Sequence, residues 1–352
     1  MIATLTLGTV LMTAGSLGGH DPMSPLRIIG TEVVNDHGRK VLLRGVNCAA
    51  LEWSSDGEGH IWDTVQVAVR DWHANVVRLP LSQDRWFGKA PEQTDGGAAY
   101  RRLVKSIVGF CADNGAYVML DLHWNNAGTW GQNIGQHFMP DMLSVEFWKD
   151  CAETFKNHPA VIFDLYNEPH SVTWDLWRDG GWVDEQRAVG ARQGPFIPTR
   201  YRAPGMQQLL DTVRDTGAMN VVAVGGLDWS YDLSGFLRGY QLKDPKGRGV
   251  IYKCHAYPFK GDTVDQFLVK LDAALPQIPV IISEFGATSP PEEADRPNPW
   301  VVRMLDEMEK RTVHWAAWDL HPAAGPVLIS DWDYTPTPSF GALVKEALRR
   351  SH

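Results

Sequence analysis

The sequence lacks several features that mark particular classes of protein. It has no run of lysine and arginine, and its net charge of −9 argues against a nucleic-acid partner. It has no low-complexity segment and no linker rich in proline, serine or threonine, so no appended binding module is expected. No Gly-rich phosphate-binding turn follows an early strand-like run, which argues against an open dinucleotide-binding sheet.

Cysteine is also scarce. The four cysteines lie far apart and none forms a C-x-x-C pair, so we expect no zinc site, and we expect no other cofactor. We predict free, buried thiols, because cysteine often packs as a small hydrophobic residue. A disulfide between Cys111 and Cys151, both on predicted helices, is the alternative.

The N-terminal residues 1–19 carry no charged side chain. They resemble the apolar part of a secretion signal, but no lysine or arginine precedes them, and threonine and glycine dilute their hydrophobicity. We therefore expect a leader or mobile segment at residues 1–25 and one folded domain at residues 26–352. No later segment is apolar enough to predict a membrane span.

In the rest of the chain, strand-like apolar runs alternate with helix-like stretches. Several runs are continuously apolar, as expected when both faces of a sheet are covered. The eight predicted strands are Val41–Asn47, Asn75–Pro80, Ala116–His123, Val161–Glu168, Val221–Gly226, Val250–His255, Val280–Phe285 and Val313–Asp319. The predicted helices include Ala98–Asn114, Val145–Asn157, Gly205–Thr216, Thr263–Leu275 and Pro299–Lys310.

This alternation predicts the fold. Eight β/α units in succession indicate an α/β protein with a closed parallel (β/α)₈ TIM barrel, whose long βα loops would form a cleft. A short β-hairpin is expected first, with Arg27–Val34 joined to Val41–Asn47 by a turn at 35–38. A doubly wound open sheet is the alternative.

The predicted strands end in polar and aromatic side chains. In a (β/α)₈ barrel the active site lies at these C-terminal ends. The side chains placed there are Arg78, His123, Asn167, Glu168, His255, Tyr257, Glu284 and Trp318. With 42 acidic residues in the chain, one carboxylate alone says little. Glu168 and Glu284 are informative because they end the fourth and seventh strands, which lie roughly opposite each other across the barrel mouth.

Two facing carboxyl groups suit the cleavage of a glycosidic bond. One must be protonated to assist the leaving oxygen, and the other must be ionised to attack the sugar or to activate water. Arg78 would keep one carboxyl ionised, while burial would keep the other protonated. Each residue alone also has a structural explanation, such as a rim ion pair for Arg78 or core packing for His123 and Trp318.

The motif Leu165–His170, which reads LYNEPH, resembles the Asn-Glu-Pro signature of glycoside hydrolase family 5. Five further strand ends look like that family in the same order: VRLP at 77–80, DLHW at 121–124, HAY at 255–257, ISEFG at 282–286 and WAAW at 315–318. The resemblance covers roughly residues 27–350. It implies that Glu168 is the general acid and then the general base, and that Glu284 is the nucleophile.

The resemblance also implies roles for the remaining rim residues. They would bind the sugar or adjust the carboxyl groups: Arg78 and Tyr257 at Glu284, His255 at Glu168, Asn167 at the sugar 2-hydroxyl, His123 at the same sugar and Trp318 beneath it. A retaining pair should have its carboxyl groups about 5 Å apart.

Tryptophan is abundant, with 15 residues. Its flat apolar face can stack on a sugar ring. We expect about half of the tryptophans to be core, and we predict that Trp124, Trp182 and Trp229 in long loops bind substrate. Packing within those loops is the alternative. The segment Ser330–Tyr334 has too few carboxylates for a calcium site, so we predict a capped loop there.

These features predict a secreted, monomeric, retaining endo-β-1,4-glucanase (a cellulase) acting on β-glucan. Secretion is expected from the polymeric substrate. A β-mannanase, a xyloglucanase or an exo-acting β-glycosidase are alternatives, which cleft shape would separate. A carbohydrate-binding protein without catalysis is remote, since both glutamates are present. A Schiff-base aldolase is disfavoured because Lys253, the only lysine on a predicted strand, lies before the rim.

Overall fold

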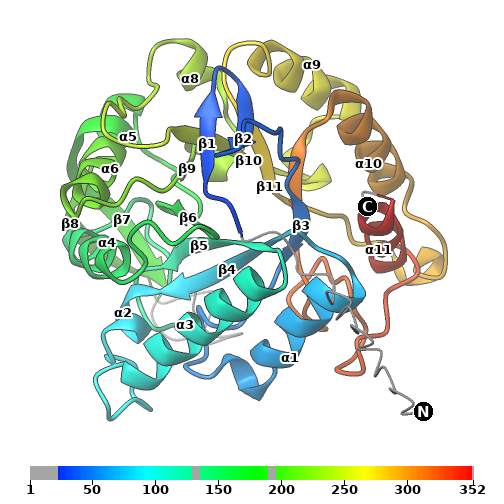
Figure 1. Ribbon diagram of the computed structural model, residues 1–352, viewed down its shortest axis with the longest axis horizontal. Coiled ribbons are helices and arrows are strands. Elements are labelled where there is room, and N and C mark those ends of the chain that lie inside the picture. The colour runs from blue at the N-terminus through cyan, green and yellow to red at the C-terminus, as the bar shows by residue number, and fades with distance from the viewer. Residues whose placement is uncertain (1–22, 129–134, 189–195, 351–352) are drawn as a thin grey trace, which may run out of the picture.

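The computed structural model describes residues 23–128, 135–188 and 196–350, so most of the expected leader lies outside the described residues. Eight parallel strands close into a barrel in the order β10-β11-β12-β3-β4-β5-β6-β9 (Figure 1). They are β3 (Arg44–Asn47), β4 (Val76–Ser82), β5 (Tyr117–Trp124), β6 (Val161–Asp164), β9 (Val222–Gly225), β10 (Val250–Ala256), β11 (Val280–Phe285) and β12 (His314–Ala317). The predicted barrel is confirmed, and the open sheet is excluded.

Helices surround the barrel. The five predicted helices are present with ends shifted by at most three residues: α3 (Ala98–Asp113), α4 (Met142–Thr154), α6 (Met206–Asp215), α9 (Val264–Ala274) and α10 (Pro299–Arg311). The structure adds α1 (Ile61–Gln66), α2 (Gln83–Trp86), α5 (Trp174–Asp179), α7 (Leu227–Ser230), α8 (Ser234–Leu237) and α11 (Gly341–Arg349). Local sequence sets the helix starts. Asp141 caps α4 and Thr263 caps α9, each by accepting a backbone N–H of the first turn.

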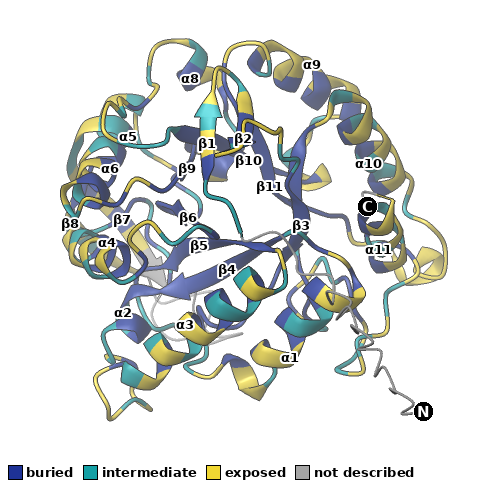
Figure 2. Cartoon of the chain, in the orientation of Figure 1, coloured by how far each residue is buried: buried dark blue, intermediate teal, exposed yellow. Residues whose placement is uncertain are grey.

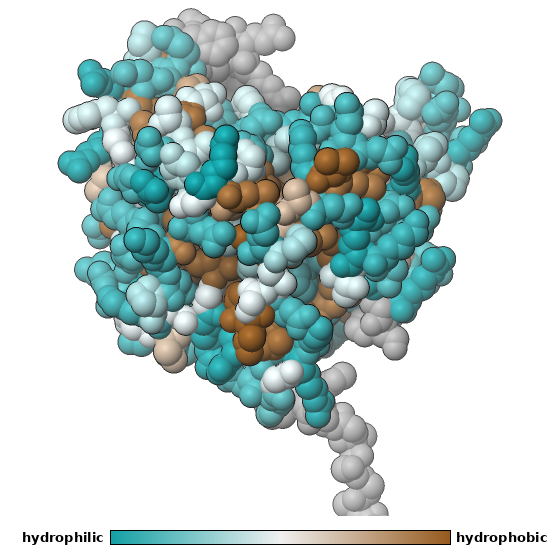
Figure 3. Space-filling model, turned by 90° about the horizontal axis from the view of Figure 1, so that it is seen from above, coloured by the Kyte–Doolittle hydropathy of each residue, from teal (hydrophilic) through white to brown (hydrophobic). Residues whose placement is uncertain are grey.

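The core has two parts. All barrel strands are buried along their length, whereas the helices are buried on one side and exposed on the other (Figure 2). One cluster lies between strands and helices, and a smaller one, including Met119, Ile162 and Ile281, fills the barrel towards its N-terminal end. Seen from above in Figure 3, the surface is mostly hydrophilic with separate hydrophobic patches.

The N-terminal hairpin differs from the prediction. Strand β1 (Leu26–Ile29) pairs with β2 (Glu32–Asn35) across a turn in which Gly30 has φ +62°. That φ favours glycine, and its turn divides the predicted strand Arg27–Val34 into two. The predicted turn at 35–38 is also present, and beyond it Val34 forms an isolated antiparallel bridge with Lys40. The predicted continuation of this pairing along Val41–Asn47 is wrong, because β3 belongs to the barrel. The hairpin lies across the N-terminal end of the barrel (Figure 1), where Leu26 and Val33 join the inner cluster.

The long segment after Pro169 is not an open loop. It contains α5 and an antiparallel hairpin of β7 (Gly180–Ala188) with β8 (Phe196–Pro204). Trp177 of α5 is fully buried, and Trp174 packs partly buried against the same core. Seven described tryptophans are buried, in line with the expected share: Trp53, Trp72, Trp86, Trp124, Trp148, Trp177 and Trp315.

Three smaller expectations can be compared with the structure. All four cysteines are buried and free, so the alternative Cys111–Cys151 disulfide is not formed. Asp331 accepts hydrogen bonds from the backbone N–H groups of Asp333 and Thr335, which gives the predicted capped loop. Among the helices that the structure describes, none is both long and apolar enough to cross a membrane.

Candidate active site

Arg78, fully buried in β4, lies at the centre of the candidate site. Its guanidinium donates to Oε1 of Glu284 at 2.6 Å, to Oδ2 of Asp164 at 2.9 Å and to Oδ1 of Asn167 at 2.9 Å. It also lies 3.0 Å from Oδ2 of Asp121. Because the guanidinium is planar and rigid, it fixes the spacing of side chains that come from three strands: β5, β6 with the segment that follows it, and β11.

Glu284 lies near the end of β11, and its side chain is 5% exposed. While Oε1 accepts from Arg78, Oε2 accepts from the hydroxyl of Tyr257 at 2.7 Å. Nδ1 of His255 lies 3.4 Å from the same oxygen. Both oxygens of the Glu284 carboxyl are therefore held in place, one by a cation and the other by a phenol.

Glu168 follows β6 on a segment that continues the strand contacts. The backbone N–H of Asn167 donates to the carbonyl of Leu122 on β5 at 3.0 Å, which fixes where Glu168 emerges. One of its carboxylate oxygens lies within 4.8 Å of one from Glu284. This separation fits the roughly 5 Å of a retaining pair and is shorter than the roughly 6.5–9.5 Å of an inverting pair.

The two carboxyl groups have different environments. Burial, and then the charge of Glu284, raise the pKa of Glu168 to about 8, although 22% of its side chain remains exposed. Burial and the nearby Arg78 lower the pKa of His255 well below its usual range, so the imidazole 2.9 Å from Glu168 is neutral. At neutral pH, Glu168 therefore carries a proton.

Asn167, His123 and Trp318 line one side of the site. Nδ2 of Asn167 lies 3.2 Å from Nε2 of His123, whose ring stacks on Trp318 with centroids 5.3 Å apart. Nδ1 of His123 lies 2.6 Å from Asp121. Burial lowers the pKa of His123, but the carboxylate of Asp121 outweighs burial and raises it. An amide, an imidazole and an indole thus converge beside the two glutamates.

Three buried ionic residues lie beneath the glutamates, and no role in the site was predicted for them from the sequence. Nζ of Lys253 lies 2.6 Å from Oδ1 of Asp164 and 3.9 Å from Oδ1 of Asp121, and all three side chains are fully buried. Each is a charged residue within an otherwise apolar strand, and its side chain points into the barrel. Because a buried charge needs partners, these charged positions could have been recognised from the sequence as members of a buried ionic cluster.

Of the three loop tryptophans, Trp124 and Trp229 remain candidates for contact with the substrate. Trp124 is only 5% exposed and packs against Trp53, with ring centroids 6.1 Å apart. Trp229 is 41% exposed, but His170 stacks on its ring at 4.3 Å and Nζ of Lys260 lies 4.7 Å from its centroid. Trp53 was not singled out from the sequence.

Trp182 does not fit its predicted role. Along β7, Val183 and Glu185 are buried, whereas Trp182, Asp184 and Gln186 are exposed. Because successive side chains of a strand point to opposite faces, Trp182 lies on the outer face of the hairpin, where Arg200 covers its ring. We therefore do not include Trp182 in the catalytic groove.

The same centre has atoms that could ligate a cation. Glu168, His255 and Glu284 each place one ligand atom within 4.8 Å of the others. However, Arg78 already contacts Glu284, and Glu168 retains its proton at neutral pH. A fixed positive charge and a protonated ligand both oppose cation binding, so this group suits proton transfer better than metal binding.

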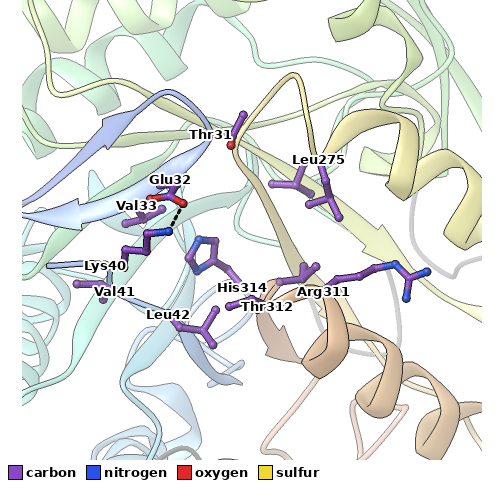
Figure 4. A pocket seen from close by; sticks show the side chains of 12 residues that line it. Thr31, Glu32, Val33, Lys40, Val41, Leu42, Leu275, Arg311, Thr312 and His314 are labelled. Carbon is purple, nitrogen blue, oxygen red and sulfur yellow. Dashed lines mark hydrogen bonds and ion pairs between the residues drawn. The ribbon is translucent and has the colours of Figure 1, made fainter.

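A cavity of about 360 Å³ lies at the other end of the barrel, away from the glutamates. It is lined by the N-terminal hairpin and by the segments that lead into β3 and β12, including Glu32, Lys40, Leu42 and His314 (Figure 4). Glu32 and Lys40 form an ion pair at its edge. In a (β/α)₈ barrel this end serves stability rather than catalysis.

Comparison with known proteins agrees with this geometry. Residues 34–324, most of the chain, match the family model described as Cellulase (glycosyl hydrolase family 5). The chain belongs to glycosyl hydrolase family 5. It is a cellulase-type glycoside hydrolase.

Relatives of this family 5 hydrolase are distant in sequence. The chain is 23% identical to cellulase CelDZ1 of Thermoanaerobacterium sp and 25% identical to endoglucanase A of Evansella cellulosilytica. Each match covers 89% of this chain, but 74% and 57% of those relatives. The β-glucanase SdGluc5_26A of Saccharophagus degradans, solved with cellotetraose, has a similar fold, with a TM-score of 0.70, 20% identity and 94% of each chain covered.

Proposed function

We propose that this chain is a retaining endo-β-1,4-glucanase with Glu168 as acid/base and Glu284 as nucleophile. The observation that carries the proposal is the pair itself. One carboxylate oxygen of Glu168 lies within 4.8 Å of one from Glu284, Glu168 carries a proton at neutral pH, and Arg78 and Tyr257 hold the Glu284 carboxyl. A proton donor and an anionic nucleophile on either side of one bond are what double displacement requires.

The contacts support a two-step reaction. In the first step, Glu284 attacks the anomeric carbon and forms a glycosyl ester, while Glu168 gives its proton to the departing oxygen. In the second step, Glu168 takes a proton from water, whose oxygen attacks the same carbon and releases Glu284. Arg78 and Tyr257 orient the nucleophile before attack and bind it again after release.

The sugar beside the glutamates would meet Asn167, His123 and Trp318. The Asn167 amide would donate to the 2-hydroxyl in place of its longer, 3.2 Å contact with His123, and the Trp318 indole would support the apolar face of the ring. Trp124 and Trp229 would flank the chain further along the groove, with Trp229 presenting the part of its ring that His170 leaves exposed.

The substrate class is inferred from relatives. The two homologues compared above are named as a cellulase and an endoglucanase, and a structural neighbour was solved with cellotetraose. A β-1,4-glucan is therefore our first choice, and a β-mannan, a xyloglucan or a terminal β-glycoside is the alternative. A polymer of this kind lies outside the cell, so we place the enzyme's action there, with residues 26–352 as the catalytic domain.

A hydrolysis panel would test the proposal. We expect the protein to release oligosaccharides from carboxymethylcellulose, barley glucan or lichenan faster than from mannan, xylan or xyloglucan. Glu284→Gln should abolish hydrolysis, and Glu168→Ala should be rescued by azide on substrates with activated leaving groups, giving a β-glycosyl azide. Wild-type activity in Glu284→Gln, or an anomerically inverted product, would contradict the mechanism.

A further inference from the structure

We propose that Gln136 is a positioning residue for this reaction and that the hairpin β7/β8 holds it in place. Gln136 lies on the segment between β5 and α4, outside every helix and strand. The inference rests on the proposed function, because it concerns the sugar 2-hydroxyl that Asn167 would bind.

The Gln136 side chain joins two parts of the catalytic centre. Its Oε1 accepts from Nδ2 of Asn167 at 2.8 Å, and its Nε2 donates to the backbone carbonyl of Glu168 at 2.8 Å. The side chain is only half-buried, whereas Asn167 is 2% exposed. Gln136 therefore lies partly exposed beside the two glutamates and ties the Asn167 amide to the backbone of the catalytic acid.

Asn167 needs this second anchor. Its Oδ1 is fixed by Arg78 at 2.9 Å, so its NH₂ group must face Gln136 and His123. The contact with His123 is longer, at 3.2 Å, and the imidazole nitrogen can accept only when it is neutral. Because the pKa of His123 is raised, this contact is lost at low pH, and Gln136 remains the acceptor that fixes the amide plane.

The backbone on both sides of Gln136 is pinned. The carbonyl of Gly135 accepts from the N–H of Asn126 at 2.9 Å, and the N–H of His137 donates to Oδ1 of Asn125 at 3.0 Å. A Cβ at Gly135 would lie 2.2 Å from the Asn126 carbonyl oxygen, so the close approach requires glycine. A side chain on so constrained a backbone is preorganised.

The β7/β8 hairpin anchors the segment that follows Gln136, and we call these contacts the clamp. Glu185 of β7 is 4% exposed; its Oε1 lies 2.5 Å from Nδ1 of His137, and its Oε2 accepts from the N–H of Phe138 at 3.0 Å. Tyr201 of β8 exchanges two hydrogen bonds with the backbone of Met139, both at 3.0 Å. Both strands of the hairpin thus grip the three residues that follow Gln136.

Stability alone does not account for this clamp. Burying a carboxylate against an imidazole is weak evidence for stabilisation, because loss of hydration offsets much of the attraction. The buried pair does fix a segment in one conformation. That segment places Gln136 against Asn167 and Glu168, so the clamp acts on the geometry of the site.

The test compares Gln136 variants on two substrates, an aryl β-cellobioside and its analogue that lacks the 2-hydroxyl on the reactive ring. Gln136→Met keeps the size but removes both hydrogen bonds. We expect it to lower kcat on the parent roughly tenfold with little change in KM, since the contact to the 2-hydroxyl strengthens in the transition state. On the 2-deoxy substrate, we expect a loss of less than about twofold.

Two further variants distinguish the loss of the contact with Asn167 from a general effect on folding. Gln136→Glu keeps the acceptor for Asn167 but loses the donor to Glu168, so it should retain the preference for the parent substrate. Its added charge near Glu168 should also move the alkaline limb of the pH profile upward. Gln186→Met makes the same chemical change on the outer face of β7 and should behave like the wild type.

The outcomes distinguish this inference from the proposed function. Equal losses on both substrates in Gln136→Met, or no loss on either, would overturn the positioning role. So would a Gln136→Glu variant with no preference for the parent substrate. If the wild type failed to hydrolyse the cellobioside, or if Glu284→Gln remained active, the proposed function would fall instead.

Discussion

Replacing Glu168 by glutamine should stabilise the folded protein at alkaline pH while it removes activity. The pKa of this carboxyl rises from 4.5 to about 8 on folding. The folded state therefore holds the proton more tightly than the unfolded chain does. This contribution to stability is complete below pH 4.5 and is lost as the pH rises through about 8. Glutamine resembles the protonated side chain and has no proton to lose.

The size of the effect follows from the shift. A difference of roughly 3.5 pKa units corresponds to about 5 kcal/mol at most. The side chain keeps 22% of its surface exposed, so solvent screens part of this cost. We expect Glu168→Gln to raise the free energy of unfolding by about 2–3 kcal/mol at pH 9. For a domain of this size, that is an increase of about 3–5 °C in Tm.

Thermal unfolding of both proteins between pH 4 and pH 9 would measure this difference. The gap in Tm should be close to zero at pH 4 and should open as the pH rises. Glu293→Gln, the same change at an exposed carboxylate, is the control and should give no pH-dependent gap. A constant gap at all pH values, or a less stable Glu168→Gln at pH 9, would refute the reasoning.

Three more outcomes follow from contacts in the site. Tyr257→Phe removes the hydrogen bond to the nucleophile and should lower kcat about tenfold, and an unchanged kcat would contradict that contact. Lys253→Met should cost about 3–5 kcal/mol of unfolding free energy in denaturant titrations, and adding Asp164→Asn should recover part of it unless packing alone is responsible. Trp229→Ala should raise KM on long glucans more than on aryl glycosides, whereas Trp182→Ala should affect neither.

The barrel and its rim could be predicted because parallel strands leave a strong local signal. Apolar runs, several of them continuous, marked all eight strands, and the carboxyl ends of such strands meet at one rim. This placed Arg78, Glu168 and Glu284 at one rim, and in the structure Arg78 contacts Glu284, whose carboxylate lies within 4.8 Å of that of Glu168. The ends of the strands differ from the prediction. Strand β6 ends at Asp164 rather than at Glu168, although backbone hydrogen bonds to the neighbouring strands continue to Asn167.

Features that depend on distant partners could not be predicted in the same way. The β7/β8 hairpin has a mixed polar sequence, and it forms because Glu185 and Tyr201 bind a segment some 50 residues earlier. The position of Trp182 could be judged only once the strand and its buried face were known. The role of Gln136 likewise depends on two residues that lie about 30 positions away along the chain.

The position of His255 links the two halves of the proposed reaction. Its Nδ1 lies 2.9 Å from Glu168 and 3.4 Å from Glu284, so a neutral N–H can follow the negative charge as it moves from Glu284 to Glu168. That transfer requires only one of the glutamates to be charged at the start. Above about pH 8, Glu168 also ionises and has no proton to give. We therefore expect kcat/KM to fall about tenfold per pH unit above this value. A profile measured on an aryl β-cellobioside whose alkaline limb begins below pH 6 would contradict this account.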